Sequence, residues 1–508
     1  MIDRSFGVGN VPYLDIDNHG VVNIDASFHI HLAEAKGFQS SVTPQTWSLV
    51  QNYVADLKQR NIRIAIFGTT TQGNANANAT RSLVRLSHSL GIDMRWYISD
   101  PSSNIAYLVE KMRKLLHGSA SPQVNLSSDE KLQLLNWVYR NAKFHWLCPN
   151  GPLRSTQQGG AHVVIIDDAS LSALALISKH HDSKRPVIFR SNQHISYSLS
   201  ESFHSPQTDV LDFIWSTLKH ADILAYQAPS QIEYPCIPRS KVGYTLASVD
   251  KFDGVNKDMK DWDQVVYGRQ FNVSCRDSGT TTINYPNDKY ILVEMATAPL
   301  VEHALTVLHA YKEYYELWKS SASPEHLPKL LLCVRQTHSH DSGDFFASIT
   351  SHIALHMKDL QGSIVMNRIK PPEQVWNTLL SKAELVILFY DPEDYEERFL
   401  EAVHKGKAVL RTEPLGPYGS LVENRTNVST VGVADFHAMS QSLFQNLTLG
   451  DHQDLCNFPP SNAWDEFTTA GNSVNWFYLA STLTKGKCIE PNGEYIYRLA
   501  QGRAKDTS

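Results

Sequence analysis

The sequence has few cysteines for its length, and their spacing fits neither a zinc site nor a disulfide framework. The six thiols are far apart and form no CxxC pair. They are Cys148, Cys236, Cys275, Cys333, Cys456 and Cys488. Scattered cysteines of this kind are typical of reduced thiols in an intracellular protein. We therefore expect a protein that holds no metal.

An excess of one charge and a long apolar run are also missing. The net charge is −6 over 508 residues and the basic residues are scattered, which gives no electrostatic reason to expect a nucleic-acid partner. No stretch approaches the roughly 18 uncharged apolar residues of a membrane-spanning helix, and the N-terminus has no apolar signal-peptide core. We expect a cytoplasmic protein that binds a small molecule and no membrane, and for which a homodimer is possible.

The familiar nucleotide and nucleophile motifs are absent as well. The chain contains no P-loop, no nucleophile elbow, no Gly-x-Gly-x-x-Gly fingerprint and no kinase motif set. No cofactor is therefore predicted from local motifs.

What the chain does have is a regular alternation of short apolar runs and longer amphipathic stretches, which indicates an α/β fold. Ten runs are continuous enough to predict strands of parallel sheets buried on both faces. They fall into two series of five, separated by a polar stretch at 277–288. The predicted strands are 63–68, 94–98, 162–167, 186–191 and 223–228, then 290–296, 330–335, 363–368, 385–390 and 408–413.

Two such series predict two Rossmann-like, doubly wound domains that face one another across a cleft. At 508 residues the chain is too long for one core. We expect domains at 1–265 and 280–465, with the apolar helix near Asn472–Leu483, in the segment 466–508, completing the first domain. Ligands of such sheets bind outside the carboxyl ends of the strands, so the residues that follow each strand are the candidates.

Asp167 and Asp168 are the best acid/base candidates among these residues, because they end a predicted buried strand and face the predicted cleft. Burial would raise the pKa of a carboxyl there towards a useful range. The pair could equally cap the helix that follows. His29 and His31 are two positions apart, so on a strand both side chains would point to the same side. No third ligand is spaced to complete a metal site.

Several longer blocks resemble a known family. They are GTTTQG, HVVIIDDAS, PVIFRSNQHI, VDKFDGVNKDMKDWD, RIKPPEQVWNTLLSKAELVILFY, ERFLEAVHKGKAVLR and AGNSVNWFYLASTL, in this order. Together they resemble the fungal trehalose phosphorylases and the related trehalose synthases, which are retaining glycosyltransferases of family four with the two-domain GT-B fold. The resemblance runs from about residue 20 to about residue 500.

This resemblance implies transfer of glucose, with retention, from an activated donor to glucose. Glu393 and Glu401 match the E-x7-E element of the family, in which one carboxylate approaches the hydroxyls of the donor sugar. From the residues alone, the same stretch is also consistent with the acidic first turn of an amphipathic helix, because carboxylates complement the helix dipole.

The chain departs from the family pattern where the donor phosphate would bind. The family has an Arg and a Lys after the first strand of the second domain, whereas this chain has Thr297 and Glu302. In the first domain, Gly73 is kept but is followed by Asn74 instead of further glycines, which makes close approach of the backbone to a phosphate doubtful.

Other changes cluster at the same strand ends. A family His is replaced by Asn192, with His194 two residues later, and the glycine-rich loop after the strand at 330–335 becomes Arg335–Ser339, which adds His338. Arg81 and Arg335 are the basic residues nearby that could substitute for the missing cations. We assign catalytic roles to Glu393, Asp168 and His194, and substrate binding to Glu401, Arg81, Asn192, Gly73, Asn74, Thr297, Arg335 and His338.

The sequence thus favours a retaining hexosyltransferase of the trehalose phosphorylase or synthase type with an altered donor site. Two alternatives stay open. The scaffold could carry a non-glycosyl reaction such as an acid/base isomerisation, elimination or cyclisation, or it could be a catalytically silent binding protein.

Overall fold

The structure of the chain is a computed structural model, which describes most of its residues. The described residues are 15–23, 34–71, 75–99, 102–117, 120, 123–191, 205–227, 234–295, 300–321, 326–335, 343–369, 373–389, 395–412, 428–449 and 464–502.

Contacts divide the chain into two units. The central unit contains the described residues between 249 and 459, and the N-terminal unit contains those between 13 and 248 together with those after 459. Each unit is described by itself. The domain boundaries given above stay a prediction.

The N-terminal unit is built on a seven-stranded parallel sheet in the order β15-β8-β7-β6-β5-β3-β4. Its strands are β3 (Arg63–Gly68), β4 (Asp93–Ile98), β5 (Val163–Ile166), β6 (Val187–Ser191), β7 (Ile223–Tyr226), β8 (Val242–Tyr244) and β15 (Glu494–Tyr495). The chain runs outward from β3 to β4 and then returns to the other side of β3 with β5. The strand order therefore reverses between β3 and β5, which is where such sheets bind ligands.

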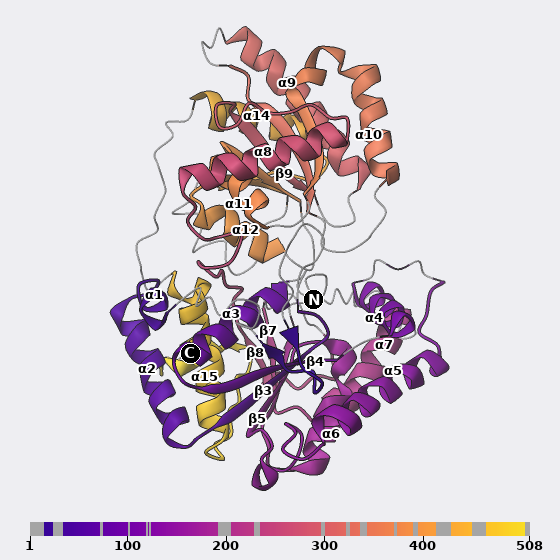
Figure 1. The fold of residues 1–508 in the computed structure, drawn as a ribbon. Helices are drawn as coiled ribbons and strands as arrows, with labels where there is room; N and C mark the ends of the chain where they lie inside the picture. The colour runs from indigo at the N-terminus through magenta and orange to yellow at the C-terminus, as the bar shows by residue number, and fades with distance from the viewer. Residues whose placement is uncertain are drawn as a thin grey trace, which may run out of the picture. The chain divides into compact units, whose positions relative to one another are not determined.

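Helices lie on both sides of this sheet (Figure 1). They are α1 (Ala35–Gln39), α2 (Pro44–Gln59), α3 (Ala75–Ser89), α4 (Ser103–Leu116), α5 (Ser128–Asn141), α6 (Ala173–His181), α7 (Pro206–Leu218), α15 (Thr469–Leu483) and α16 (Ile496–Ala500). The apolar strand residues alternate between the two helical layers, because successive side chains point to opposite faces. A small hairpin of β1 (Asp15–Ile16) and β2 (Val22–Asn23) lies beside β4.

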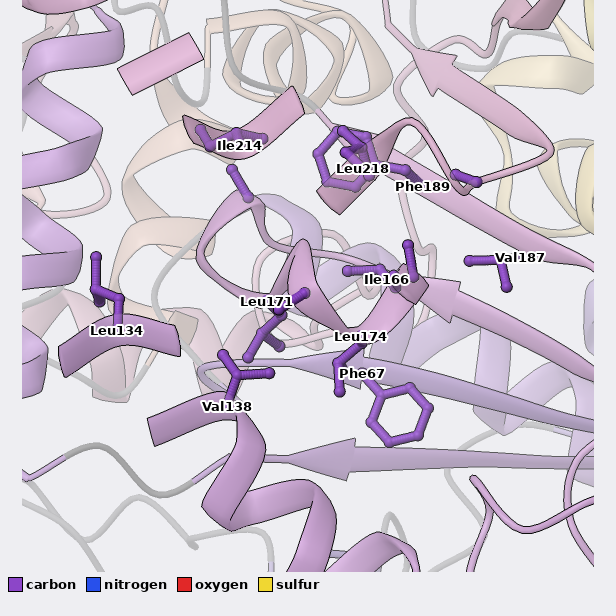
Figure 2. Packing of buried hydrophobic residues seen from close by; sticks show 14 of the residues in the cluster. Phe67, Leu134, Val138, Ile166, Leu171, Leu174, Val187, Phe189, Ile214 and Leu218 are labelled. Atoms are coloured by element: carbon purple, nitrogen blue, oxygen red, sulfur yellow. The ribbon is translucent and has the colours of Figure 1, made fainter. Parts of the chain in front are cut away.

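One face of the sheet forms the larger core of this unit with α4, α5, α6 and α7. Phe67 and Ile166 from the strands meet Val138, Leu174 and Ile214 from the helices, all of them buried (Figure 2). The packing of these apolar runs is the physical reason that they form strands covered by helices.

The other face is covered by helices from both ends of the chain. Helix α15 packs against α2 and α3, and most of its residues are buried. Asp465, just before α15, accepts hydrogen bonds from the backbone N–H of Thr43 at 3.1 Å and from the Thr43 hydroxyl at the start of α2. The last part of the chain is therefore an integral layer of the N-terminal unit.

The central unit has a six-stranded parallel sheet in the order β11-β10-β9-β12-β13-β14. Its strands are β9 (Tyr290–Met295), β10 (Lys329–Arg335), β11 (Ile364–Ile369), β12 (Leu385–Leu388), β13 (Ala408–Arg411) and β14 (Val428–Thr430). Here the strand order reverses between β9 and β12, so that this unit repeats the doubly wound plan.

The helices of the central unit again cover both faces. They are α8 (Asp261–Asp277), α9 (Val301–Ser320), α10 (Gly343–His356), α11 (Glu373–Lys382), α12 (Tyr395–His404) and α14 (Phe436–Phe444). The apolar core on one face joins the sheet to α9, α10 and α14. In the described part of the chain, no helix is both long enough and apolar enough to cross a membrane.

All ten strands predicted from apolar runs are present, with ends that differ by at most two residues. The sequence reasoning missed β1, β2, β8, β14 and β15, because strands of two or three residues carry too few side chains to form a pattern.

Candidate functional site

The reversal point of the N-terminal sheet brings together Thr69, which follows β3, and Asp168, which closely follows β5. The Thr69 hydroxyl donates to Asp168 Oδ2 at 2.7 Å. This contact ties the ends of two neighbouring strands at the position where doubly wound sheets bind ligands. Asp168 therefore lies where the sequence placed it.

Asp168 is also the cap of the short helical turn Ala169–Leu171. Its Oδ1 accepts from the Ser170 backbone N–H at 2.8 Å and from the Ser170 hydroxyl at 2.6 Å. The capping role that the sequence left open is thus present in the structure. The acid/base role stays a prediction, and it would have to coexist with three hydrogen bonds that already hold the carboxylate.

Asp167, the other acid/base candidate, forms a buried ion pair with Arg190 that the sequence analysis did not predict. Arg190, on β6, donates through Nε to Asp167 Oδ1 at 2.5 Å and makes a second contact through its terminal nitrogen with Asp167 Oδ2. The Thr80 hydroxyl on α3 donates to Asp167 Oδ2 at 2.8 Å and accepts from Arg190. Burial raises the pKa of Asp167, and the Arg190 guanidinium opposes that rise.

The network continues into the last long helix. The Arg190 guanidinium lies 5.4 Å from the centre of the Trp476 ring, a distance at which a cation and an aromatic face attract one another. Trp476 donates to Asn472 at 3.0 Å, and Asn472 donates to the carbonyl oxygen of Leu246 at 2.7 Å. Helix α15 is thereby fastened to β6 and to the chain just after β8.

This network connects α3 and β6, the two elements next to the predicted site residues of this unit. Gly73 and Asn74 come just before α3, and Asn192 and His194 come just after β6. All four lie outside the described residues, and their roles stay predictions. Arg81 lies on α3, where it donates to Asn78 at 3.2 Å.

In the central unit, the carboxyl end of the sheet carries a row of side chains that crosses all six strands. Residues paired across parallel strands point to the same face. The register gives the row Asn367, Cys333, Glu294, Leu388, Arg411 and Thr430. The first five are buried, so this polar row lies beneath helices rather than in water.

Two charged groups in this row are held by specific partners. Glu294 forms an ion pair with Arg398 of α12, with 3.4 Å between Oε1 and Nε, and both side chains are 2% exposed. Arg411 donates to the Thr430 hydroxyl at 2.8 Å and lies 5.9 Å from the Phe399 ring. The sequence analysis expected an edge poor in cations and nominated Arg81 and Arg335, but it missed these two buried arginines.

Glu401 lies one turn after Arg398 on α12 and is 2% exposed. Lys405, just after the end of α12, is attracted by Asp258, Asp253 and Glu401, which oppose the lowering of its pKa by burial. Lys405 donates to the carbonyl oxygens of Asn256 at 2.8 Å and Lys257 at 3.2 Å. The second glutamate of the E-x7-E element is therefore a buried residue on a helix anchored at both ends.

The anchor at the far end is a compact loop in the block VDKFDGVNKDM. Asp253 accepts from the backbone N–H groups of Val255 and Asn256 at 2.9 and 2.7 Å. Asn377 of α11 donates to the carbonyl oxygen of Gly254 at 3.1 Å. A Cβ on Gly254 would lie 2.4 Å from Glu373 Oε2, so this close approach requires glycine.

The remaining predicted residues of the central unit are not placed by the structure. Glu393, Thr297 and His338 lie outside the described residues, as do His29 and His31 of the N-terminal unit. Arg335 ends β10, and its side chain is not described. Glu302 is an exposed residue in the first turn of α9. Among the described residues, no group of three His, Cys, Asp or Glu side chains is arranged to hold a metal.

Comparison with known proteins gives a consistent set of relatives. A trehalose phosphorylase from Pleurotus pulmonarius is 26% identical over 97% of this chain and 67% of its own length. Residues 66–233 match the family model of the trehalose synthase N-terminal domain. The chain is similar to the fungal trehalose phosphorylases over nearly its whole length. The resemblance stated from the motifs is confirmed, and these relatives are glycosyltransferase enzymes.

Comparison with solved structures concerns the fold of the chain. A trehalose-6-phosphate synthase aligns with a TM-score of 0.57 at 8% identity, over 84% of this chain and 99% of that one. A UDP-forming trehalose-phosphate synthase from Burkholderia xenovorans, solved with glucose-6-phosphate, gives 0.50 at 9% identity, over 83% and 97%. The predicted GT-B fold class is confirmed.

Proposed function

We propose that the chain is a retaining hexosyltransferase of the trehalose phosphorylase or synthase type, which acts on a glucosyl donor through an altered donor site. The observation that carries the proposal is the match to trehalose phosphorylase over 97% of the chain, which includes both units. The proposal keeps the expectation of a cytoplasmic enzyme with a small sugar or sugar phosphate as substrate and with no nucleic-acid or membrane partner.

In this proposal the sugar-binding carboxylates come from the segment around α12. Glu401 is buried on that helix, and the ion pair between Arg398 and Glu294 fixes the helix against β9. A buried carboxylate on a braced helix is suited to hold sugar hydroxyls, because a fixed acceptor does not have to be ordered when the ligand arrives. Glu393 would be its companion, with Asp168 and His194 on the acceptor side.

The donor phosphate is the part expected to have changed. Charge develops on the leaving phosphate as the glycosidic bond breaks, and preorganised positive groups normally meet it. Thr297 and Glu302 stand where the family has its Arg and Lys, and Glu302 is exposed in the first turn of α9. The loss of one such donor costs about 3 kcal/mol, so trehalose phosphorolysis is expected to be weak.

The binding experiment measures the melting temperature with glucose 1-phosphate, UDP-glucose, trehalose and phosphate. A ligand that binds the folded state raises the melting temperature by mass action. We expect at least one sugar ligand to raise it, and Glu401→Gln to remove that rise while Glu396→Gln, on the same helix, keeps it. Fast turnover of trehalose and phosphate by the unmodified chain would contradict the altered donor site.

The charge argument has a separate test. The double variant Thr297→Arg with Glu302→Lys restores the cations of the family, and we expect it to strengthen glucose 1-phosphate binding by about tenfold or more. Unchanged binding would show that these positions do not meet the phosphate.

A silent or repurposed scaffold is the second candidate, and the exposed acid Glu302 at the expected phosphate position favours it. If no sugar or sugar phosphate shifts the melting temperature of the unmodified chain or of the double variant, this second candidate replaces the first.

A further inference from the structure

His303 of the central unit lies at the point where the strand order of its sheet reverses. The reversal is between β9, which ends at Met295, and β12, which ends at Leu388. Leu388 pairs with Glu294, so Phe389, the residue after β12, is level with the end of β9. The His303 ring stacks on Phe389, with 4.6 Å between the ring centres and 10° between the ring planes. The imidazole therefore lies at the edge of the sheet where doubly wound units bind ligands.

The stack holds the imidazole by its face and leaves the nitrogens at the edge of the ring. Phe389 is 2% exposed and belongs to the apolar core, whereas His303 is partly exposed. Within the described part of the chain, neither ring nitrogen of His303 forms a hydrogen bond. These nitrogens can donate a hydrogen bond to a ligand or accept one from it. His303 is therefore positioned as a contact for a substrate.

Glu302, the preceding residue of α9, points in a different direction. Successive residues of an α-helix are separated by about 100° around the helix axis. Glu302 is exposed, whereas His303 faces the sheet through its contact with Phe389. The carboxylate that stands where the family has its Lys is consequently not directed at the position that the imidazole occupies.

We propose that His303 donates a hydrogen bond to the phosphate group of the glucosyl donor. This inference rests on the proposed glucosyl transfer. Phosphate oxygens accept hydrogen bonds, and an imidazole has an N–H donor in both of its protonation states. Negative charge grows on the leaving phosphate as the glycosidic bond breaks, so a donor placed there stabilises the transition state more than the bound substrate. His303 thus supplies part of what the missing Arg and Lys supply in the family.

The protonation of the imidazole gives a second expectation. Burial lowers the pKa of His303, and the negative charge of Glu302 opposes this fall. In the unliganded chain the imidazole is therefore mostly neutral at pH 7. A bound phosphate places negative charge beside the ring and raises its pKa, because an opposite charge favours the protonated form. Binding then takes up a proton, so it is tighter at about pH 6 than at about pH 8.

The first test compares two substitutions on α9 by isothermal titration calorimetry of the full chain with glucose 1-phosphate. His303→Phe keeps an aromatic ring against Phe389 and removes both nitrogens, so we expect it to weaken binding by about tenfold or more. His309→Phe replaces an exposed histidine of the same helix and should bind like the parent. Equal affinity of the parent and His303→Phe would overturn the proposal.

The same measurement at several pH values separates a phosphate contact from a loss of packing. The ratio of the parent's affinity to that of His303→Phe should fall as the pH rises from about 6 to about 8. Taking the ratio removes the titration of glucose 1-phosphate itself, which also occurs near pH 6. A ratio that does not change with pH would show that the substitution acts through packing alone, and the proposal would be wrong.

The second test needs no sugar. Inorganic phosphate is titrated into the full chain with isotope-labelled histidine, and the NMR signal of His303 is identified by its absence from His303→Phe. We expect phosphate to shift this signal and to raise the pKa that it reports; an unchanged signal overturns the proposal. If phosphate shifts the signal but no sugar or sugar phosphate binds, the phosphate contact is confirmed and the proposed glucosyl transfer is wrong. If sugar phosphates bind without moving the signal, the glucosyl transfer is supported and the His303 contact is wrong.

Discussion

Each unit has a buried carboxylate–guanidinium pair near the carboxyl ends of its strands, but the two pairs connect different kinds of secondary-structure element. Asp167 and Arg190 join the end of β5 to β6, and Thr80 adds α3. Glu294 and Arg398 join β9 to α12 across 3.4 Å. The first pair therefore fixes strand ends to one another, whereas the second fixes a helix that carries a candidate sugar-binding residue to the sheet.

This difference suggests how each pair contributes to a site. Hydrogen-bonded strand ends give a fixed support for the segments that precede α3 and follow β6. Helix α12 is held by the ion pair of Arg398 on one side of Glu401 and by the hydrogen bonds of Lys405 on the other. The two halves of the scaffold should consequently respond differently when a charge is removed or titrated.

The largest effect is expected from Arg190→Met, which leaves Asp167 buried without its charged partner. Breaking such a pair costs about 3 to 5 kcal/mol. Urea unfolding followed by hydrogen exchange reports each unit separately and should show the loss in the N-terminal unit. Arg81→Met, on α3, is the control and should change the free energy of unfolding by less than about 1 kcal/mol.

The pair interpretation also predicts recovery. The double variant Arg190→Met with Asp167→Asn removes both charges, so it should be more stable than Arg190→Met alone. If the double variant is less stable, the cost arises from lost packing instead of from an unpaired charge.

The second effect concerns Glu466 in the N-terminal unit, whose pKa burial raises to about 8. A hydrogen bond from the backbone N–H of Leu246, the positive charge of Arg498 and a hydrogen bond from the side chain of Asn475 oppose this rise. The unfolded carboxyl titrates near 4.5, so the folded state holds the extra proton between these values. Stability is full below about pH 4.5 and is lost as the pH rises towards 8, at about 1.4 kcal/mol per pH unit.

Glu466→Gln should therefore stabilise the N-terminal unit by about 3 kcal/mol at pH 7 and by little at pH 4.5. Unfolding measured at both values gives the difference directly. Equal stabilisation at the two pH values would mean that Glu466 is ionised in the folded protein at both.

The third effect has the opposite sign and concerns His404 in the central unit. Burial, with Lys405 and Lys251 nearby, lowers the pKa of His404 to about 4. Its stability contribution is full above the unfolded value near 6.5 and is lost as the pH falls through 4. Acidification from pH 7 to pH 5 should cost the central unit about 2 kcal/mol, and His404→Gln should reduce that loss. If the free energy of unfolding of the central unit is the same at pH 7 and pH 5, this prediction is wrong.

The smallest effect tests the loop that anchors α12. Gly254→Ala places a Cβ 2.7 Å from the Cβ of Glu373, which overpacks the loop and should cost about 1 to 3 kcal/mol in the central unit. Gly362→Ala is the control, because its Cβ would meet nothing within 4 Å. Equal effects of the two variants would mean that the loop adjusts without cost.

The fold could be predicted from the sequence because most of its strands are continuous apolar runs. Such runs can be recognised without knowing which strands pair. The candidate site was only partly accessible by the same reasoning. Asp168 follows directly from its place after β5, and its bond to Thr69 is a property of the strand order.

Arg190, Arg398 and Arg411 were missed because their partners are distant in the sequence. Arg190 and Thr80, for example, are separated by 110 positions. A signal was nevertheless present. A charged residue near the end of an otherwise apolar strand, such as Arg190 in β6, Glu294 in β9 or Arg411 in β13, must be compensated when the strand is buried. That rule identifies three of the buried charges without any structure, although it does not identify their partners.

The joining of α15 to α2 has a consequence for synthesis on the ribosome. Thr43 at the start of α2 pairs with Asp465, and Thr46 with Tyr497, at 2.8 Å between the hydroxyls. Residues 13–248 emerge first, yet the layer that covers α2 arrives only after the entire central unit has been translated. We expect nascent chains halted before residue 460 to expose the apolar side of α2 and to be cut there by protease, whereas the released full-length chain resists cleavage.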